Sequence, residues 1–285
     1  LFICKYLSTS ENGFETRLAT LIKLFKKNNY EVAAITSSNS FKKFKFKKKY
    51  SSKIIDNVKY YFIRDYKDYS LYSLKRIISW IKFEVDLFKF NYKKISFKPD
   101  IIYISSLSLL TILNGIYLKK KFKAKLVFEM RDFWPYFLYT TGKFSKFNPF
   151  VIFLGLVEKY GIYKSDLIVS LIPKISEYLK YRGFDKKKSF ASTFPVNKNF
   201  FKKLKNNKLN LNNKYFNICY AGNFGFDNYL DTLLNLIKAT QNKHFLFHFF
   251  GDGSQKKILK EKYSHLENVK FYDHVDYHSL HSILI

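Results

Sequence analysis

Two glycine-containing turns near the end of the chain have the residue types that a phosphate site needs. The first follows the apolar run "FNICYAG" and contains Gly222, Asn223 and Gly225, and an amphipathic helical pattern at 228–240 comes next. Glycines let the backbone approach a pyrophosphate closely, and a helix N-terminus offers free N–H groups and the positive end of its dipole. This spacing predicts a phosphate-binding turn.

The second turn, "FFGDGS", contains Gly251, Asp252 and Gly253 and follows the next apolar run along the chain. In open α/β sheets, ligands bind outside the carboxyl ends of the strands. Because the two turns end successive strands, we expect them to form one nucleotide-phosphate site.

An earlier turn has a weaker form of the same pattern. Gly13 opens a helical pattern directly after the first strand pattern, and Arg17 lies on the first turns of that helix. The dipole and the free N–H groups again favour an anion. The alternative is a plain strand–helix connection that contains a glycine.

Charged residues end the apolar run "KLVFEM". Glu129, Arg131 and Asp132 lie at its carboxyl end, where α/β proteins build their sites. Charges at the end of a buried strand have little solvent, so they need a partner or a ligand. We expect these three residues to serve a catalytic centre. The alternative is a structural pair of Arg131 with Asp132 that closes the domain.

Lysine is interleaved with phenylalanine at 41–49, "FKKFKFKKK", and again in the helical pattern at 80–94. This composition suits a lipid interface in which aromatic rings enter the membrane and ammonium groups meet lipid phosphates. The sequence therefore indicates an anionic membrane surface as a partner. The alternative is a solvated loop followed by an ordinary helix.

The overall charge favours anionic partners. The 285 residues carry 51 basic and 22 acidic side chains, a net charge of +29, and only five of the basic residues are arginine. A lysine excess gives a diffuse positive field without the bidentate contacts of base readout. No helix-turn-helix, zinc or RNA-binding pattern accompanies the charge, so we expect no nucleic-acid partner. We assign about half of the charge to compositional drift and the rest to anionic partners.

Cysteine and histidine usage indicates neither a disulfide framework nor a metal site. Cys4 and Cys219 each lie in an apolar strand pattern, so we expect buried free thiols in a cytosolic protein. His274, His278 and His281 gather near the C-terminus, but no matching acidic or thiol ligand is set elsewhere, and we expect no metal. The sequence shows no signal peptide, and its apolar runs are shorter than the roughly 18 residues of a membrane span.

Strand and helix patterns alternate along the chain, which predicts an α/β fold of two Rossmann-like, doubly wound domains. A lysine- and asparagine-rich break at 198–215 separates an N-terminal domain, residues 1–200, from a C-terminal domain, residues 201–285. The chain begins at Leu1 inside a strand pattern and ends at Ile285 after three strands of the second domain. We therefore interpret the sequence as a fragment whose second domain is incomplete. The expected strands of the first domain are "LFICKYL", "EVAAIT", "VKYYFI", "DIIYIS", "KLVFEM" and "DLIVSLI".

The order of these landmarks resembles the GT-B glycosyltransferases of family 4, especially the bacterial group that builds O-antigen and capsule. The matching segments run through the whole chain: "NGFETRL", "PDIIYISSLSLL", "LVFEMRDFWP", "VEKYGIYKSDLIVSLIPKISEYL", "FPVN", "YAGNFGFDNYLDTLL" and "FFGDGSQKKIL". Such enzymes bind an acceptor in the first domain and a nucleotide-sugar, usually a UDP-sugar, in the second. The resemblance implies a hexosyltransferase that moves sugar to a lipid-linked or saccharide acceptor, with no cofactor, in the cytoplasm at the inner face of the membrane.

The resemblance also implies roles for the candidate residues. Gly222, Asn223 and Gly225 would line the donor diphosphate, and the turn from Gly251 through Asp252 to Gly253 would flank the nucleotide. On the acceptor side, Gly13 and Arg17 would face the substrate, and Glu129, Arg131 and Asp132 would present polar groups to the reacting sugar. Members of the family generally retain anomeric configuration, with the leaving diphosphate helping to take the acceptor proton, and need no metal.

The sequence departs from the family in two respects. Relatives place arginine and lysine just after the second-domain turn, whereas "GFDNYL" has neither and Lys238 lies far along its helix. The glutamate pair that contacts the donor sugar would lie beyond Ile285, so we expect the chain as given to bind donor poorly and to catalyse little. Two other readings stay open: an inactive relative that binds membrane surfaces, and a UDP-sugar 2-epimerase.

Overall fold

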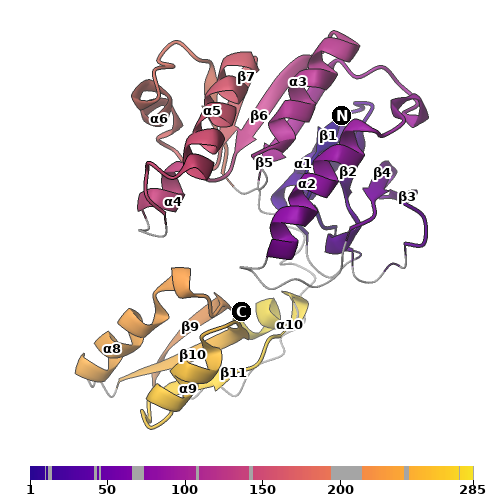
Figure 1. Cartoon of the computed structure of the whole chain (residues 1–285). Coiled ribbons are helices and arrows are strands. Elements are labelled where there is room, and N and C mark those ends of the chain that lie inside the picture. Colours follow the sequence, from indigo (N-terminus) through magenta and orange to yellow (C-terminus); the bar gives the residue numbers. More distant parts are fainter. Residues whose placement is uncertain are drawn as a thin grey trace. The chain divides into compact units, whose positions relative to one another are not determined.

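The computed structural model describes residues 1–9, 11, 15–41, 44, 46–65, 74–106, 109–140, 144–193, 214–240, 244–275 and 277–284. The chain forms two compact units, Leu1–Pro195 and Val196–Ile285 (Figure 1). Nearly all of the expected break at 198–215 lies outside the described residues.

The described part of the first unit contains an eight-stranded sheet in the order β3-β4-β2-β1-β5-β6-β7-β8. Every neighbouring pair is parallel except β3 and β4. The strands are β1 (Phe2–Ile3), β2 (Ala33–Ser37), β3 (Tyr50–Ile55), β4 (Val58–Ile63), β5 (Ile101–Ser106), β6 (Lys125–Met130), β7 (Leu167–Ser170) and β8 (Ser189–Ala191).

Helices cover both faces of this sheet. Apolar side chains of α2 (Leu74–Phe88), α3 (Thr111–Phe122), α5 (Pro149–Lys164) and α6 (Ile175–Tyr181) pack against one face. The other face packs against α1 (Arg17–Lys27). The short α4 (Tyr136–Thr140) follows β6. Two buried faces explain why the strands are continuous apolar runs.

The sheet reverses its winding between β1 and β5. Strands β2 and β4 lie on one side of β1, and β5, β6, β7 and β8 follow in order on the other. This is the doubly wound arrangement that the sequence predicted, and the point of reversal is where such sheets bind ligands, at the carboxyl ends of the strands.

Strand β3 was not expected from the sequence. It forms an antiparallel hairpin with β4 through Asp56 and Asn57, whose φ angles are 51° and 59°. Two successive residues at positive φ form the type I′ turn that joins tight hairpins, and aspartate and asparagine are favoured there.

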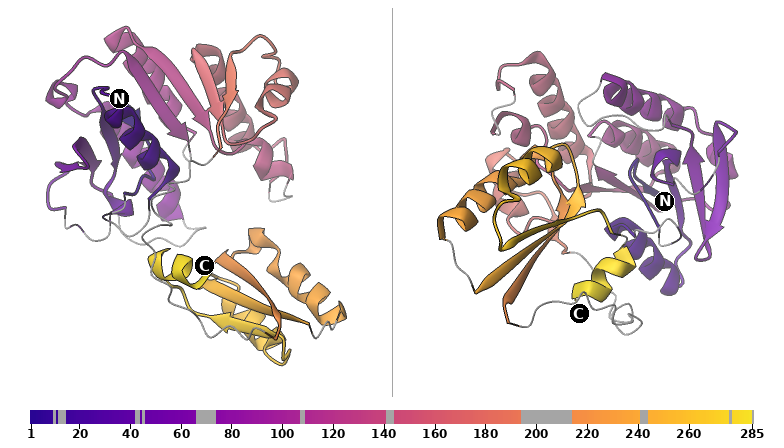
Figure 2. Two further views of the ribbon diagram at one scale, coloured as in Figure 1. Left: turned by 180° about the vertical axis from the view of Figure 1, so that it is seen from behind. Right: turned by 90° about the horizontal axis from the view of Figure 1, so that it is seen from below.

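The second unit contains, within the described residues, a parallel three-stranded sheet in the order β11-β10-β9. Its strands are β9 (Phe216–Asn223), β10 (Phe245–Asp252) and β11 (Val269–Tyr272). Helices α8 (Leu230–Thr240) and α9 (Lys256–Tyr263) pack on one face through Leu234 and Leu259, and α10 (Tyr277–Leu284) follows β11 (Figure 2). The alternation of strands and helices expected for this part of the chain is confirmed.

Candidate functional site

The two predicted phosphate turns lie next to each other in the second unit. Strands β9 and β10 are parallel neighbours in a register that sets Gly222 opposite Gly251 and Asn223 opposite Asp252. The turns also bond to each other: the Phe224 N–H donates to the Asp252 carbonyl at 2.9 Å, and the Gln255 N–H donates to the Phe224 carbonyl at 2.9 Å. The structure thus joins both turns into one loop pair at the carboxyl edge of the sheet.

The glycines of the second turn are required by this close approach. Gly251 and Gly253 have φ angles of 139° and 156°, a region that other residues rarely adopt. A Cβ atom on Gly251 would lie 1.9 Å from the Gly222 carbonyl oxygen, and one on Gly253 would lie 2.4 Å from Oδ1 of Asn223. These two glycines therefore have a structural role whatever they bind.

Gly225 is different, because its backbone is extended, with φ −86° and ψ 159°. It precedes a 3-10 turn, Phe226–Asn228, and α8 begins only at Leu230, two residues later than the expected start. The Asn223 carbonyl accepts hydrogen bonds from Tyr220 Oη at 2.9 Å and Asn228 Nδ2 at 2.6 Å, which hold the turn in shape.

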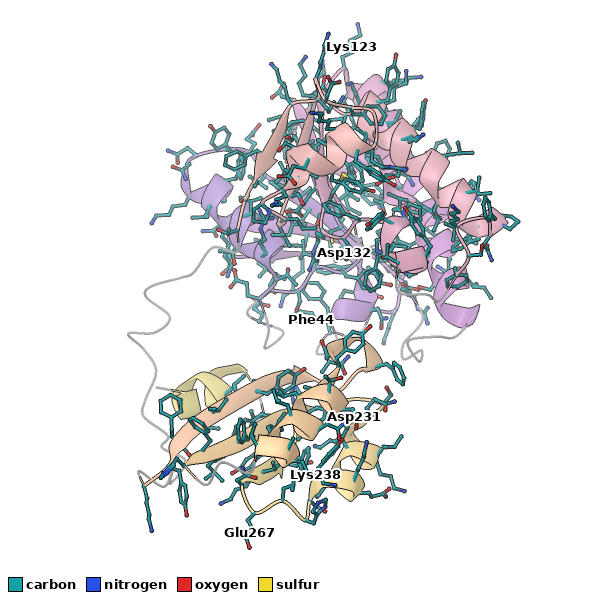
Figure 3. All side chains as sticks on the ribbon, turned by 90° about the vertical axis from the view of Figure 1, so that its left-hand side faces the viewer. Phe44, Lys123, Asp132, Asp231, Lys238 and Glu267 are labelled. Atoms are coloured by element: carbon teal, nitrogen blue, oxygen red, sulfur yellow. The ribbon has the colours of Figure 1, made fainter. Side chains whose placement is uncertain are left out.

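Lys256 adds a positive charge to the loop pair, and the sequence analysis did not predict this contribution. Its Nζ donates to the Gly251 carbonyl at 2.9 Å and to Oδ1 of Asp273 at 2.7 Å, and its side chain is 15% exposed. The signal in the sequence is simple, since Lys256 follows Gly253 by three residues. Lys238, by contrast, lies about two turns beyond Asp231 along α8 (Figure 3).

In the first unit, two candidate residues from different elements form a buried ion pair. Arg17 of α1 donates from Nη1 to Oε1 of Glu129 in β6, and the two side chains are 6% and 1% exposed. Arg17 also donates to the carbonyls of Thr193 and Ser192, at 3.3 Å each. Glu129 thus lies within the strand, and its carboxylate charge is already balanced by Arg17. Its predicted catalytic role would require the ion pair between Arg17 and Glu129 to break. Gly13 lies outside the described residues.

Arg131 and Asp132 do leave the carboxyl end of β6. Arg131 is partly buried and Asp132 is exposed. Although Asp132 is an exposed residue, desolvation of its carboxyl group raises its pKa, and the charge of Arg131 opposes that shift. These two residues are therefore placed where the sequence predicted them, and their roles stay predictions.

Aromatic residues gather at the same edge. The Trp80 Nε1–H donates to Tyr6 Oη at 2.6 Å, and the rings of Trp80 and Trp134 lie 6.2 Å apart at 90°. All three residues are partly buried, and the Trp134 N–H donates to the Asp132 carbonyl at 3.0 Å. We call Tyr6, Trp80 and Trp134 the aromatic wall.

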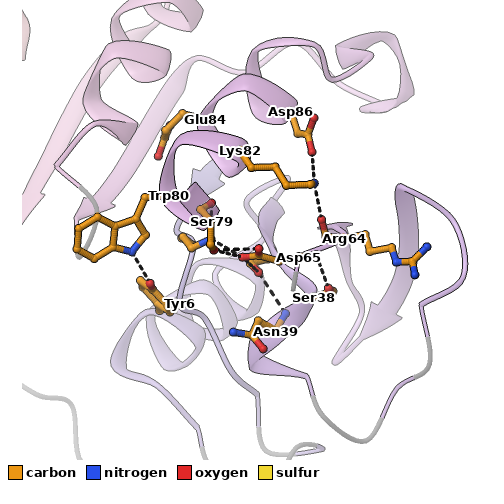
Figure 4. A network of polar contacts seen from close by, with 12 residues as sticks. Tyr6, Ser38, Asn39, Arg64, Asp65, Ser79, Trp80, Lys82, Glu84 and Asp86 are labelled. Carbon is orange, nitrogen blue, oxygen red and sulfur yellow. Dashed lines mark hydrogen bonds and ion pairs between the residues drawn. The ribbon is translucent and has the colours of Figure 1, made fainter. Parts of the chain in front are cut away.

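A buried polar network lies beside Tyr6 and Trp80 (Figure 4). Lys5, two residues after β1, is 1% exposed and pairs with Asp65, two residues after β4. Lys5 Nζ also donates to Ser79 Oγ at 2.7 Å, and Ser37 Oγ donates to Asp65 at 3.1 Å. Desolvation lowers the pKa of Lys5, while the Asp65 charge opposes this. The network fixes β1, β2, β4 and α2 relative to one another.

A cavity in the first unit lies on the side of the sheet that packs against α1. It has a volume of about 530 Å³, and its lining includes Glu31, Val32 and Asp100, which precede β2 and β5. The lining also includes the candidate residue Arg17 and Ser192, whose carbonyl accepts a hydrogen bond from Arg17. The cavity is mainly apolar, and we assign it no catalytic role.

The phenylalanines of 41–49, which were expected to enter a membrane, pack against the protein core instead, whereas Phe88 in the second expected segment is 55% exposed. Phe41 is fully buried, and Phe44 and Phe46 pack against the core, with the Phe46 ring 4.7 Å from that of Phe62. The described rings of 41–49 are therefore not free to insert in lipid. In the described part of the chain, no helix is long and apolar enough to span a bilayer, and no cluster of three histidine, cysteine or acidic residues has metal-binding geometry.

Comparisons with known proteins show the fold. No family model and no curated protein sequence matches the chain. Among solved structures, sucrose-phosphate synthase from Thermosynechococcus elongatus has a TM-score of 0.71 at 13% identity, over 99% of this chain and 71% of that one.

Two further structures show the same architecture. A trehalose-6-phosphate structure from E. coli bound with UDP-2-fluoro glucose has a TM-score of 0.66 at 10% identity, over 98% of this chain and 74% of that one. The catalytic domain of starch synthase IV from Arabidopsis thaliana, bound to ADP and acarbose, has a TM-score of 0.66 at 12% identity, over 99% of this chain and 75% of that one. The chain is thus an α/β protein of the GT-B type, built from Rossmann-like units.

Proposed function

We propose that this protein is a glycosyltransferase that moves a hexosyl group from a nucleotide-sugar, preferably a UDP-sugar, to a lipid-linked or saccharide acceptor in the synthesis of a surface polysaccharide. The observation that carries the proposal is the loop pair of the second unit, in which two glycine turns join at the carboxyl ends of β9 and β10. Parallel α/β sheets bind phosphates at this position. Two solved structures of similar fold were obtained with UDP-2-fluoro glucose and with ADP.

The loop pair supplies the features that a donor diphosphate needs. Gly225 has no side chain to block the approach of a phosphate, and its extended backbone needs no glycine. A Cβ atom at this position would lie 2.8 Å from Nδ2 of Asn223, which is the far end of a side chain that can move. Lys256 lies against Gly251 and is paired with the fully exposed Asp273, so a bound diphosphate would compete with that carboxylate for the Lys256 charge. Stabilising negative charge on the leaving group is the main electrostatic contribution that such a transfer requires.

The first unit supplies the acceptor side. Sugar rings present C–H groups on their faces and hydroxyl groups at their edges, and partly exposed indole and phenol rings can contact the former. The aromatic wall therefore suits a saccharide acceptor, and the carboxylate of Asp132 suits its hydroxyl groups. The contribution of these residues is to orient the acceptor hydroxyl.

The proposed transfer retains the anomeric configuration. A bond forms between the acceptor oxygen and the anomeric carbon on the face from which the diphosphate leaves. The bond from that carbon to the diphosphate oxygen breaks, and the leaving diphosphate takes the acceptor proton. The protein's part is to hold both substrates and to stabilise the leaving charge.

We further propose that the protein works in the cytoplasm as a peripheral protein at the inner face of the cell membrane. A lipid-linked acceptor is held in that membrane, and the net charge of +29 attracts the protein to anionic lipid.

The first test is calorimetric titration of the whole chain with UDP and with ADP. The Gly225→Leu variant adds a side chain without backbone strain, and Lys238→Leu adds the same side chain on α8 away from the loops. We expect Gly225→Leu to weaken UDP binding by about tenfold or more and Lys238→Leu to leave it unchanged. If Gly225→Leu binds UDP as tightly as the wild type does, the loop pair is not the nucleotide site. Vesicle binding without any nucleotide binding would favour the inactive membrane-binding relative.

A further inference from the structure

Helix α5 is apolar on the side that faces solvent as well as on the side that faces the core. Val151, Leu154 and Val157 are buried, and a Cβ atom on Gly161 would lie 2.7 Å from the Ile112 side chain of α3, so the inner side is closely packed. Figure 1 shows α3 and α5 side by side. A surface helix that is apolar all round needs something to cover its outer side.

The outer side has large exposed residues. Their exposed fractions are 73% for Phe147, just before the helix, and then 49% for Ile152, 48% for Phe153, 62% for Leu156, 42% for Tyr160 and 66% for Tyr163. Ile152, Leu156, Tyr160 and Tyr163 follow one another in steps of four, four and three residues, and Phe153 precedes Leu156 by three, so these side chains form one stripe along the helix. We call these six residues the α5 face.

The exposed charges of residues 144–164 are all positive. Lys146 lies 5.0 Å from the ring of Phe147, and Lys164 lies 4.9 Å from that of Tyr163. Lys159 is exposed on the helix itself. The one acidic residue between 144 and 164 is Glu158, which is fully buried and paired with Arg182.

Building on the proposed function, we propose that the α5 face is the surface by which this protein docks on an anionic lipid bilayer. The rings and aliphatic side chains enter the interface, and the flanking lysines meet the lipid phosphates. The 16 residues of α5 fall short of the about 20 that a membrane span needs, so the helix lies in the plane of the interface.

The charge of the chain favours an anionic bilayer over a second copy of the chain as the partner that covers the α5 face. Two copies joined at this face would bring together two bodies of net charge +29 and two rims of lysine, whereas an anionic bilayer neutralises both. The outer side of α2 provides a comparison. It exposes Ile78, Ile81 and Val85 at 55%, 52% and 45%, and its two acidic residues are both engaged, since Asp86 is buried and paired with Lys82 and Glu84 accepts from Asn114.

The experiment is flotation of the whole chain with phosphatidylcholine vesicles that contain or lack phosphatidylglycerol. The triple variant Ile152→Gln, Phe153→Gln, Leu156→Gln is compared with a matched control on α2, Ile78→Gln, Ile81→Gln, Val85→Gln. We expect wild type and control to bind the anionic vesicles, and the α5 variant to bind at least about tenfold more weakly. Calorimetric titration with UDP, without vesicles, measures the proposed donor site separately.

Three results would overturn the proposal. The α5 variant binds anionic vesicles as tightly as wild type, or the wild type binds none, or the wild type sediments as a dimer that the α5 variant does not form. If the α5 variant loses its circular dichroism signal, the charge-reversal variant Lys146→Glu, Lys159→Glu, Lys164→Glu decides instead. Its changes lie at exposed or partly exposed sites, and it should lose binding to anionic vesicles; retained binding would overturn the proposal as well.

Discussion

Arg17 and Glu129, 112 residues apart in the sequence, form an ion pair in the interior of the first unit. The pair joins α1 to β6, and the further bonds of Arg17 to the carbonyls of Ser192 and Thr193 extend the connection to the chain just beyond β8. Two residues that were predicted to face substrate therefore bind each other. The structural role of the pair can be tested by measuring stability, separately from any catalytic role.

Removing one partner of this pair should destabilise the first unit. Glu129→Leu leaves the Arg17 charge buried without its carboxylate, and Arg17→Met does the converse, so each should cost about 3–5 kcal/mol. The double variant should cost less than the sum of the two. Urea unfolding followed by tryptophan fluorescence reports on this unit, because Trp80 and Trp134 are the two tryptophans of the chain. Additive costs of under about 1 kcal/mol each would show that the pair contributes little.

Replacing Gly251 should loosen the second unit. Gly251→Ala places a Cβ atom 1.9 Å from the Gly222 carbonyl and strains a φ of 139°, so we expect a loss of about 2–4 kcal/mol. Gly183→Ala is the control, because its φ is 86° but the space around it is open, and it should cost about 1–2 kcal/mol. Hydrogen exchange of peptides from β9 and β10 measures the first effect. Unchanged protection there would mean that the two strands can separate without loss.

Neutralising Lys256 should weaken nucleotide binding. A charge-assisted contact contributes about 1.5–3 kcal/mol, so Lys256→Met should lower UDP affinity by about tenfold or more. The neighbouring Lys257, whose side chain is 90% exposed, gives the matched control Lys257→Met. Calorimetry at low and moderate salt checks both, and the wild type should show the steeper salt dependence. Identical affinities of the two variants would exclude Lys256 from the site.

Acid should destabilise the second unit through His248. This residue is 2% exposed between Asn217 Oδ1, at 2.9 Å from Nε2, and Tyr272 Oη, at 3.0 Å from Nδ1. Desolvation lowers its pKa below the ordinary value of 6.5, and Lys270 adds to the shift.

The unfolded chain therefore binds the proton more readily, so stability is present above pH 6.5 and is lost as the pH falls toward the folded pKa. The variant His248→Gln should lack this part of the pH dependence. Thermal unfolding of both proteins across that range is the measurement, and parallel pH curves would contradict the assignment.

Much of the fold follows from local pattern. The runs "VKYYFI" and "KLVFEM" match the bounds of β4 and β6, because strands buried on both faces are continuous apolar segments. Strand β3 was missed because it lies at the edge, where its burial is low and lysine and serine interrupt the apolar pattern. The turn signal of Asp56 and Asn57 was nevertheless present.

The site was less predictable, since its contacts join distant residues. Nothing local indicates that Lys5 pairs with Asp65, or that Trp80 meets Tyr6 and Trp134, because these contacts depend on strand order. Lys256 is an exception, since it lies within one helical turn of Gly253 and the motif itself could have revealed it. The membrane prediction for the phenylalanines of 41–49 failed for a different reason. A segment in which phenylalanine and lysine alternate can bury its phenylalanines against the protein core as readily as it can insert them in a lipid surface.

Strand β9 forms an end of the described three-stranded sheet, and its eight residues pair with β10 on one side. Phe216 and Ile218 on this strand are 68% and 36% exposed. An open backbone edge with apolar side chains is a template for pairing with another chain. A preparation of the second unit alone would therefore be prone to aggregate through this edge, and solubility screens should include an inward-pointing charge or a proline on β9 before any ligand work is attempted with that unit.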